Sequence, residues 1–123
     1  HGPPGRVLDG VVAGSLGLLC DDRILAEYHD VLARPRLKID PEERDRLLDY
    51  LDRVAERVTA PPLAVALPDP DDLPFLEVAV AACADALVTG NLRDFPPEAR
   101  HGARVEAPAT FVARWAASLQ TPT

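Results

Sequence analysis

Residues 63–90 read LAVALPDPDDLPFLEVAVAACADALVTG, and this stretch decides the fold class. Two short apolar runs, LAVAL at 63–67 and ALVTG at 86–90, have the length of buried strands and lack polar alternation. Between them, a mostly apolar segment from about 72 to 83 has the length of a helix. Apolar strands separated by helices indicate a parallel sheet that is covered on both faces. The stretch therefore predicts a three-layer α/β/α domain with a central parallel sheet flanked by helices.

The segments on either side continue this α/β pattern. Asp21 or Asp22 can cap a helix that follows an apolar run, and Arg34-Pro35 ends that helix. Asp40-Pro41 with Glu43 is a strong helix start, because it joins an N-cap, a proline at the first helical position and an early acid. The further elements that we expect are helices at 4–14, 23–34, 41–58 and 108–118 and strands at 16–20 and 104–108.

Length and charge limit the classes of function. The 123 residues fit one domain, 1–123, and 47% hydrophobic residues can form a core. A net charge of −7 argues against passive binding to nucleic acid, which normally depends on Lys and Arg. RNA chemistry would need a bridging cation or local groups of arginines. The sequence shows no signal peptide and no apolar run long enough to span a bilayer, so we expect a soluble cytoplasmic protein with no membrane partner.

Acidic and polar side chains follow two of the expected strands. Asp69–Asp72 come after 63–67, and Asn91–Asp94 come after 86–90. Ligands of parallel α/β sheets collect at the carboxyl ends of the strands, so both groups are candidates for a site. An Asp at a helix start also serves as a cap, worth about 1 kcal/mol, and Asn91–Asp94 would suit an ordinary turn. Both interpretations stay open from the residues alone.

Glu27 is a third acidic position, on the apolar side of the helix expected at 23–34. Arg23, one turn earlier, is a possible i,i+4 partner, and a lone helical Glu is commonly a surface charge. Three acids from separate segments could nevertheless meet at one sheet edge. Mg²⁺ prefers oxygen ligands and needs few carboxylates when substrate phosphate completes its shell. Such an ion activates water for phosphodiester hydrolysis and supplies the positive field that an acidic chain lacks.

Three motifs together resemble PIN-domain proteins, and specifically the VapC-like toxins of toxin–antitoxin systems. The motifs are GPPGRVLDGVVAGSLGLL at 2–19, RILAEYHDVLARPRL at 23–37 and LPDPDDLPFLEVAVAACADALVTGNLRDFP at 67–96. The resemblance extends from about residue 2 to residue 112. It implies that acidic residues bind Mg²⁺ or Mn²⁺ and cleave RNA, and that a cognate antitoxin protein blocks the site. It also implies a metal-dependent ribonuclease, with a catalytically silent PIN-like binding module as the alternative.

The resemblance assigns roles to individual residues. Asp72 matches the acid at the head of the helix, with Asp69 and Asp71 as open alternatives. The residues that the resemblance implies are the catalytic and metal-binding acids Glu27, Asp72 and Asp94, and the cofactor-binding Asn91 and Thr89.

One family element is missing from the pattern. PIN domains begin with a central strand that carries an acid, and this chain matches the family just after that strand. Asp9 lies within the helix expected at 4–14, so it cannot replace the missing acid. We therefore expect a single PIN-like domain that lacks the first strand. Open strand edges and apolar surface are costly, so we also expect a homodimer, strand exchange or low stability.

Overall fold

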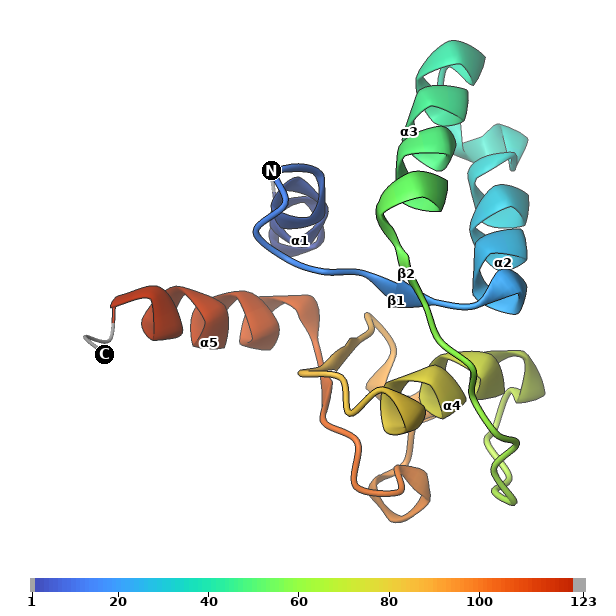
Figure 1. Cartoon of the computed structure of the whole chain (residues 1–123), viewed down its shortest axis with the longest axis vertical. Coiled ribbons are helices and arrows are strands. Elements are labelled where there is room, and N and C mark those ends of the chain that lie inside the picture. The colour runs from blue at the N-terminus through green and yellow to red at the C-terminus, as the bar shows by residue number, and fades with distance from the viewer. Residues whose placement is uncertain (1, 121–123) are drawn as a thin grey trace.

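The computed structural model describes residues 2–120. Figure 1 shows helices at the periphery and two short strand pairs between them. The helices are α1 (Pro3–Val12), α2 (Asp22–Leu32), α3 (Pro41–Val54), α4 (Leu73–Ala81) and α5 (Pro108–Gln120). The strands are β1 (Leu19–Cys20), β2 (Glu56–Arg57), β3 (Leu87–Val88) and β4 (Val105–Glu106). Four short 3₁₀ turns complete the order, of which η2 (Pro70–Asp72) and η3 (Leu92–Asp94) adjoin the candidate site.

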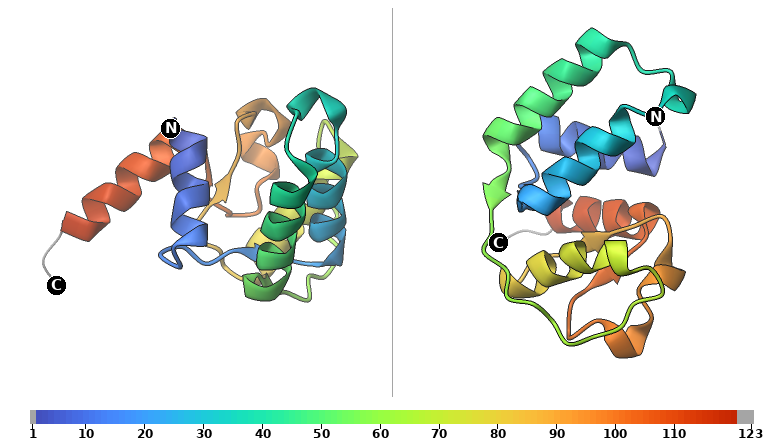
Figure 2. Two further views of the ribbon diagram at one scale, coloured as in Figure 1. Left: turned by 90° about the horizontal axis from the view of Figure 1, so that it is seen from above. Right: turned by 90° about the vertical axis from the view of Figure 1, so that its right-hand side faces the viewer.

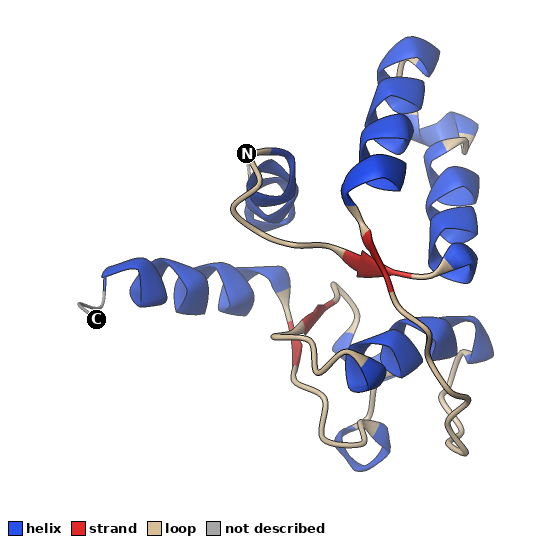
Figure 3. Ribbon diagram, in the orientation of Figure 1, coloured by secondary structure: helices blue, strands red, loops and turns tan. Residues whose placement is uncertain are grey.

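The strands form two separate parallel pairs. Strand β1 pairs with β2, and β3 pairs with β4. Parallel pairing and the α/β class agree with the sequence-based expectation. The expected single central sheet does not form among the described residues (Figure 3), and the three-layer arrangement stays a prediction.

The expected strand at 63–67 is not a strand in the structure. Its first backbone N–H, that of Leu63, donates to the carboxylate of Glu77 at 2.8 Å instead of to a neighbouring strand. Prolines at positions 61, 62 and 68 bracket the segment and offer no N–H for a ladder. Leu67 is buried and Leu63 is partly buried, so the segment packs like a strand without pairing like one.

Helix α3 ends four residues earlier than the sequence suggests. After Val54 the chain turns extended at Ala55 and pairs with β1. The N–H of Glu56 donates to the Leu18 carbonyl and that of Val58 to the Cys20 carbonyl, each at 2.8 Å. Tertiary pairing thus overrides the local helical pattern. The expected starts of the two neighbouring helices are correct, since Asp21 caps α2 and Asp40 caps α3.

The core consists of two apolar clusters that meet at helix α4. The first cluster surrounds Cys20 and Ile24 and includes Val78 of α4. The second surrounds Phe95 and Val105 and includes Leu76 of α4. Helix α4 contacts both β1 and β3, and Figure 1 and the right-hand view of Figure 2 show it below α2 and α3. Among residues 2–120, no helix is long and apolar enough to cross a membrane.

Candidate active site

Asp72 has a carboxylate with a buried oxygen that makes no hydrogen bond to the described residues. It sits where η2 meets α4, yet its side chain makes no capping hydrogen bond to the helix. Its Oδ2 atom is buried and has no hydrogen-bond partner in the described part of the chain. Burial, together with the nearby charges of Asp69 and Asp94, raises the pKa of Asp72 to about 6. Helix capping therefore does not explain this residue.

The two alternative acids of the same loop behave differently. The Oδ1 atom of Asp69 accepts the backbone N–H of Asp71 at 2.9 Å and so caps η2. Asp71 is exposed and continues the same turn. Asp69 already performs the local capping and Asp71 is exposed, so Asp72 is the acid of this loop that combines a buried oxygen with no capping role.

A short hydrogen-bonded relay holds Asp94 beside Asp72. The backbone N–H of Thr89 donates to the carbonyl of Glu106 at 3.0 Å, which ties Thr89 to strand β4. The Thr89 hydroxyl accepts the N–H of Asn91 at 3.1 Å, and the Asn91 amide donates to Asp94 Oδ2 at 2.9 Å. The charge of the nearby Asp94 contributes to the raised pKa of Asp72, so the two carboxyl groups lie close together. The predicted residues after β3 and before α4 are therefore brought together.

Glu27 lines the same pocket as Asp72. A pocket of about 490 Å³ is lined by both Glu27 and Asp72, with apolar side chains from α1, α2 and α3 around them. The rings of Tyr28 and Phe75 lie 6.3 Å apart and join α2 to α4 at this pocket. The expected ion pair between Arg23 and Glu27 is wrong. Arg23 instead pairs with Asp21 at 2.6 Å and with Glu77 at 2.7 Å.

The carboxylate oxygens of Asp72 and Asp94 suit a cation, although they do not form a complete metal site. Within residues 2–120, no three His, Cys, Asp or Glu side chains are grouped so that they could hold a metal ion. Asp72 and Asp94 do come together, and one Asp72 oxygen is buried without a donor. Two adjacent carboxylates with an unused oxygen are the hard ligands that Mg²⁺ and Mn²⁺ prefer. Glu27 lines the same pocket as Asp72 and would have to approach the pair to become a third ligand.

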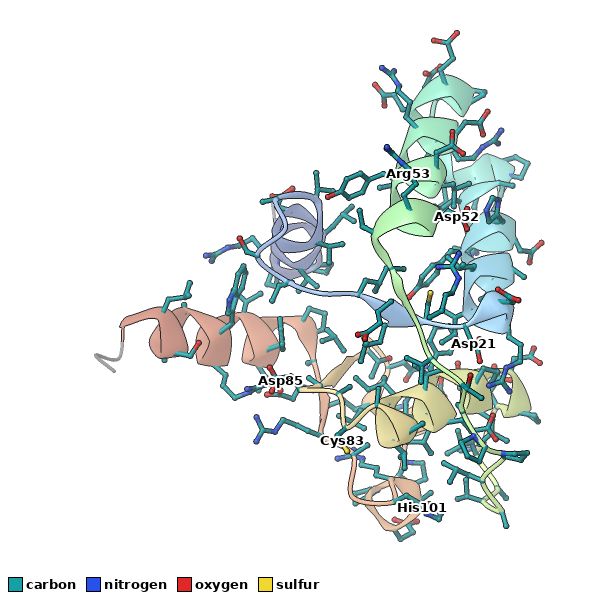
Figure 4. All side chains as sticks on the ribbon, in the orientation of Figure 1. Asp21, Asp52, Arg53, Cys83, Asp85 and His101 are labelled. Carbon is teal, nitrogen blue, oxygen red and sulfur yellow. The ribbon has the colours of Figure 1, made fainter. Side chains whose placement is uncertain are left out.

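Glu77 is a buried charge that the sequence analysis did not single out. Only 3% of Glu77 is exposed, and its carboxylate accepts from Arg23 of α2 and from the Leu63 N–H. Figure 4 shows Asp21 at the start of α2, and α2 contacts α4 there. This ion pair fixes α2, and with it Glu27, against the helix that Asp72 begins. A signal was present in the sequence, because Glu77 is the only charge within LPFLEVAVAA.

Comparison with known proteins identifies the family of the chain. A family model described as PIN domain matches residues 1–93. The match includes Glu27, Asp72, Thr89 and Asn91, and it ends one residue before Asp94. No curated protein and no solved structure matches the chain.

Proposed function

Because the chain belongs to the PIN-domain family, whose members are generally nucleases, we propose that it is a metal-dependent endoribonuclease. The observation that carries this proposal is the pairing of Asp72 with Asp94. A buried carboxylate oxygen without a donor, next to a second carboxylate, is unfavourable unless a cation completes it. In a structural acid, as in Glu77, every buried oxygen has a partner.

The proposed ligands are Asp72, Asp94 and Glu27. A bound Mg²⁺ or Mn²⁺ would supply a Lewis acid that activates water and stabilises the leaving oxygen of the phosphodiester. It would also offset the net charge of −7, which otherwise repels RNA phosphates. Mg²⁺ keeps several waters and takes further oxygens from substrate, so the two adjacent carboxylates with Glu27 as a third would be enough to hold it.

The remaining polar residues position these acids. Asn91 holds Asp94 Oδ2 through its amide, and Thr89 holds the Asn91 backbone from the end of β3. With a pKa of about 6, Asp72 keeps its proton in mild acid and loses it near pH 7. We therefore expect cation binding and cleavage to increase with pH across this range.

The cellular role is part of the same proposal. We assign the protein as the toxin of a type II toxin–antitoxin pair that acts in the cytoplasm, with a cognate antitoxin protein as its partner. A homodimer is supported by exposed apolar side chains on two helices that contact each other. Val12 of α1 is 50% exposed and Leu119 of α5 is 72% exposed. Contacts between copies would remove this apolar surface from water.

The proposal is tested by incubating a structured RNA with the protein and Mn²⁺, or with a chelator. We expect cleavage with Mn²⁺ only, and a loss of at least about 100-fold in Glu27→Gln and Asp72→Asn, because each removes a ligand. Glu98→Gln is the matched control, since Glu98 is exposed and outside the site. Equal cleavage by wild type and Glu27→Gln would contradict the assignment of Glu27.

A second candidate function is a silent PIN-like binding module. It is favoured by the absence of a three-ligand group in the described residues. A silent module would be folded, would cut no RNA, and would show no Mn²⁺-dependent stabilisation beyond that of Asp72→Asn.

A further inference from the structure

Arg93 is a cation on the same loop as the acids of the candidate site. It is the only Lys, Arg or His between residues 58 and 99. Seven acids lie in that stretch, and Asp72 and Asp94 are two of them. Arg93 belongs to η3, immediately precedes Asp94, and is exposed to solvent. A strongly acidic region therefore carries a single positive side chain, beside one of its proposed metal ligands.

The guanidinium group of Arg93 is not neutralised by the acids around it. Three acids lie close enough to Asp72 for their charges to raise its pKa, and they are Asp69, Asp71 and Asp94. Arg93 nevertheless forms no ion pair within 4.0 Å and no hydrogen bond among residues 2–120. The positive charge of Arg93 is therefore available to a ligand that reaches this loop.

Neighbouring arginines already have partners inside the protein. Arg23 of α2 forms ion pairs with two acids, at 2.6 and 2.7 Å. The Nε atom of Arg100 donates to the Phe95 carbonyl at 2.7 Å and so closes the loop that follows η3. These contacts hold segments of the fold in place. Arg93 is the arginine beside the acids that no internal contact occupies.

A bound RNA strand would need such a cation at this site. A metal ion at Asp72 and Asp94 neutralises the phosphate that it contacts, but the next phosphates of the strand still face the surrounding carboxylates and a net charge of −7. A guanidinium group is always charged at neutral pH and presents a planar set of N–H donors that matches phosphate oxygens. An exposed arginine next to Asp94 can offset the repulsion of a flanking phosphate.

We propose that Arg93 binds an RNA phosphate next to the scissile one and thereby holds the strand over the acids. The inference rests on the proposed nuclease function. It adds a substrate-binding residue that is distinct from the metal ligands, and it gives the acidic chain a direct contact with the RNA backbone.

Arg104 supplies a matched control in the same part of the chain. It is exposed and forms no ion pair in the described part of the protein. Its backbone carbonyl accepts the N–H of Leu87, at the start of β3, whereas the candidate site follows Thr89 at the other end of that strand. Arg104→Gln therefore removes the same charge as Arg93→Gln, at the opposite end of the strand pair.

The test is the binding of a fluorescein-labelled single-stranded RNA, measured by fluorescence anisotropy with Ca²⁺, which also takes carboxylate oxygens. A gel run afterwards verifies that the RNA is intact. We expect Arg93→Gln to weaken binding about tenfold in 50 mM salt and to reduce the slope of log affinity against log salt by about 0.7, the value for one phosphate contact. Arg104→Gln should change neither quantity. Arg93→Lys should keep the slope, because it keeps the charge.

Cleavage of the same RNA with Mn²⁺ separates this inference from the proposed function. If wild type cuts the RNA but Arg93→Gln binds it as tightly as wild type, the nuclease stands and the role of Arg93 is overturned. If wild type cuts nothing, the nuclease fails, and a tenfold loss of binding confined to Arg93→Gln would still support a phosphate contact. An equal loss in Arg104→Gln, or no binding of RNA by wild type, would overturn the inference.

A further measurement separates RNA binding from an effect on the acids. Thermal unfolding with Mn²⁺ should show at least as much stabilisation of Arg93→Gln as of wild type, because removal of a nearby cation does not repel the ion. A smaller stabilisation would overturn the inference, because Arg93 would then support the arrangement of the carboxylates instead of contacting RNA.

Discussion

Two carboxylates near the start of the same helix, Asp72 and Glu77, show opposite solutions to burial. Glu77 is 3% exposed, and both of its oxygens have donors, from Arg23 and from the Leu63 N–H. Asp72 is less buried as a residue, yet it holds a buried oxygen without a donor, next to other acids. The first arrangement stabilises packing between segments. The second costs stability, which is the expected mark of a site rather than of a structural group.

Of the substitutions that test this comparison, Glu77→Ala should have the largest effect on stability. We expect Glu77→Ala to destabilise the protein by about 3 kcal/mol, because it leaves the Leu63 N–H without a partner and releases α2 from α4. Arg23 is about half exposed, so its own loss is moderated by water. The measurement is urea unfolding, with the exposed Glu98→Ala as the control. A loss below about 0.5 kcal/mol, typical of surface changes, would refute a structural role for Glu77.

Substitution of Asp72 should have the opposite effect on stability, because it should stabilise the protein. A carboxyl group whose folded-state pKa is raised from 3.8 to about 6 favours the neutral form in the folded state. Its contribution to stability is complete below about pH 4 and is lost as the pH rises through about 6. We expect Asp72→Asn to stabilise the metal-free protein by about 1–2 kcal/mol at pH 7.5, a value reduced for partial solvent exposure.

The pH dependence supplies the control for Asp72→Asn. At pH 3.5 Asp72 is uncharged in the folded protein and mostly uncharged in the unfolded chain, so the free energies of unfolding of wild type and variant should nearly coincide. A stabilisation that is the same at pH 3.5 and pH 7.5 would show that ionisation of Asp72 is not its cause.

Added cation should convert Asp72 from a cost into a source of stability. At ten times its dissociation constant, Mn²⁺ would stabilise wild type by about 1.4 kcal/mol at pH 7.5. We expect a smaller effect at pH 5, because Asp72 then keeps its proton. Thermal unfolding with and without Mn²⁺ measures this. Equal stabilisation of Asp72→Asn by Mn²⁺ would place the ion elsewhere.

The smallest expected effect is at Asp69. Asp69→Asn keeps a side-chain oxygen to cap η2 but removes a negative charge that raises the pKa of Asp72. We expect stability to change by no more than about 0.5 kcal/mol, while the pKa of Asp72 falls below about 6. An NMR titration of the Asp72 carboxyl carbon detects the shift. An unchanged titration would mean that the charge of Asp69 does not contribute to this pKa.

Local sequence signals predicted the helices well. Asp21 and Asp40 cap α2 and α3 as expected, because an N-cap depends only on residues within one turn. The pairing of β1 with β2 and the early end of α3 at Val54 were not predictable, since both depend on residues far apart in sequence. The segment 63–67 was wrongly expected to be a strand, because its apolar pattern does not reveal that a side chain takes its first N–H.

The candidate site was predictable in composition but not in arrangement. The sequence indicated Asp72 and Asp94 at neighbouring strand ends, and the structure brings them together. It favoured Asp72 through the family resemblance and kept Asp69 and Asp71 as alternatives, because only geometry shows that Asp69 is the acid that caps the turn. Glu27 stays a predicted ligand, and it lines the same pocket as Asp72.

Helix α4 belongs to both core clusters, through Val78 on one side and Leu76 on the other. If either cluster opens alone, α4 still packs against the remaining one. The helix should therefore be the last element to lose amide protection in native-state hydrogen exchange, and the α2–α3 and β3–β4 regions should open as separate cooperative units with their own free energies. The helix that follows Asp72 would then stay folded while the elements around it open, so Asp72 would keep its position during these local openings.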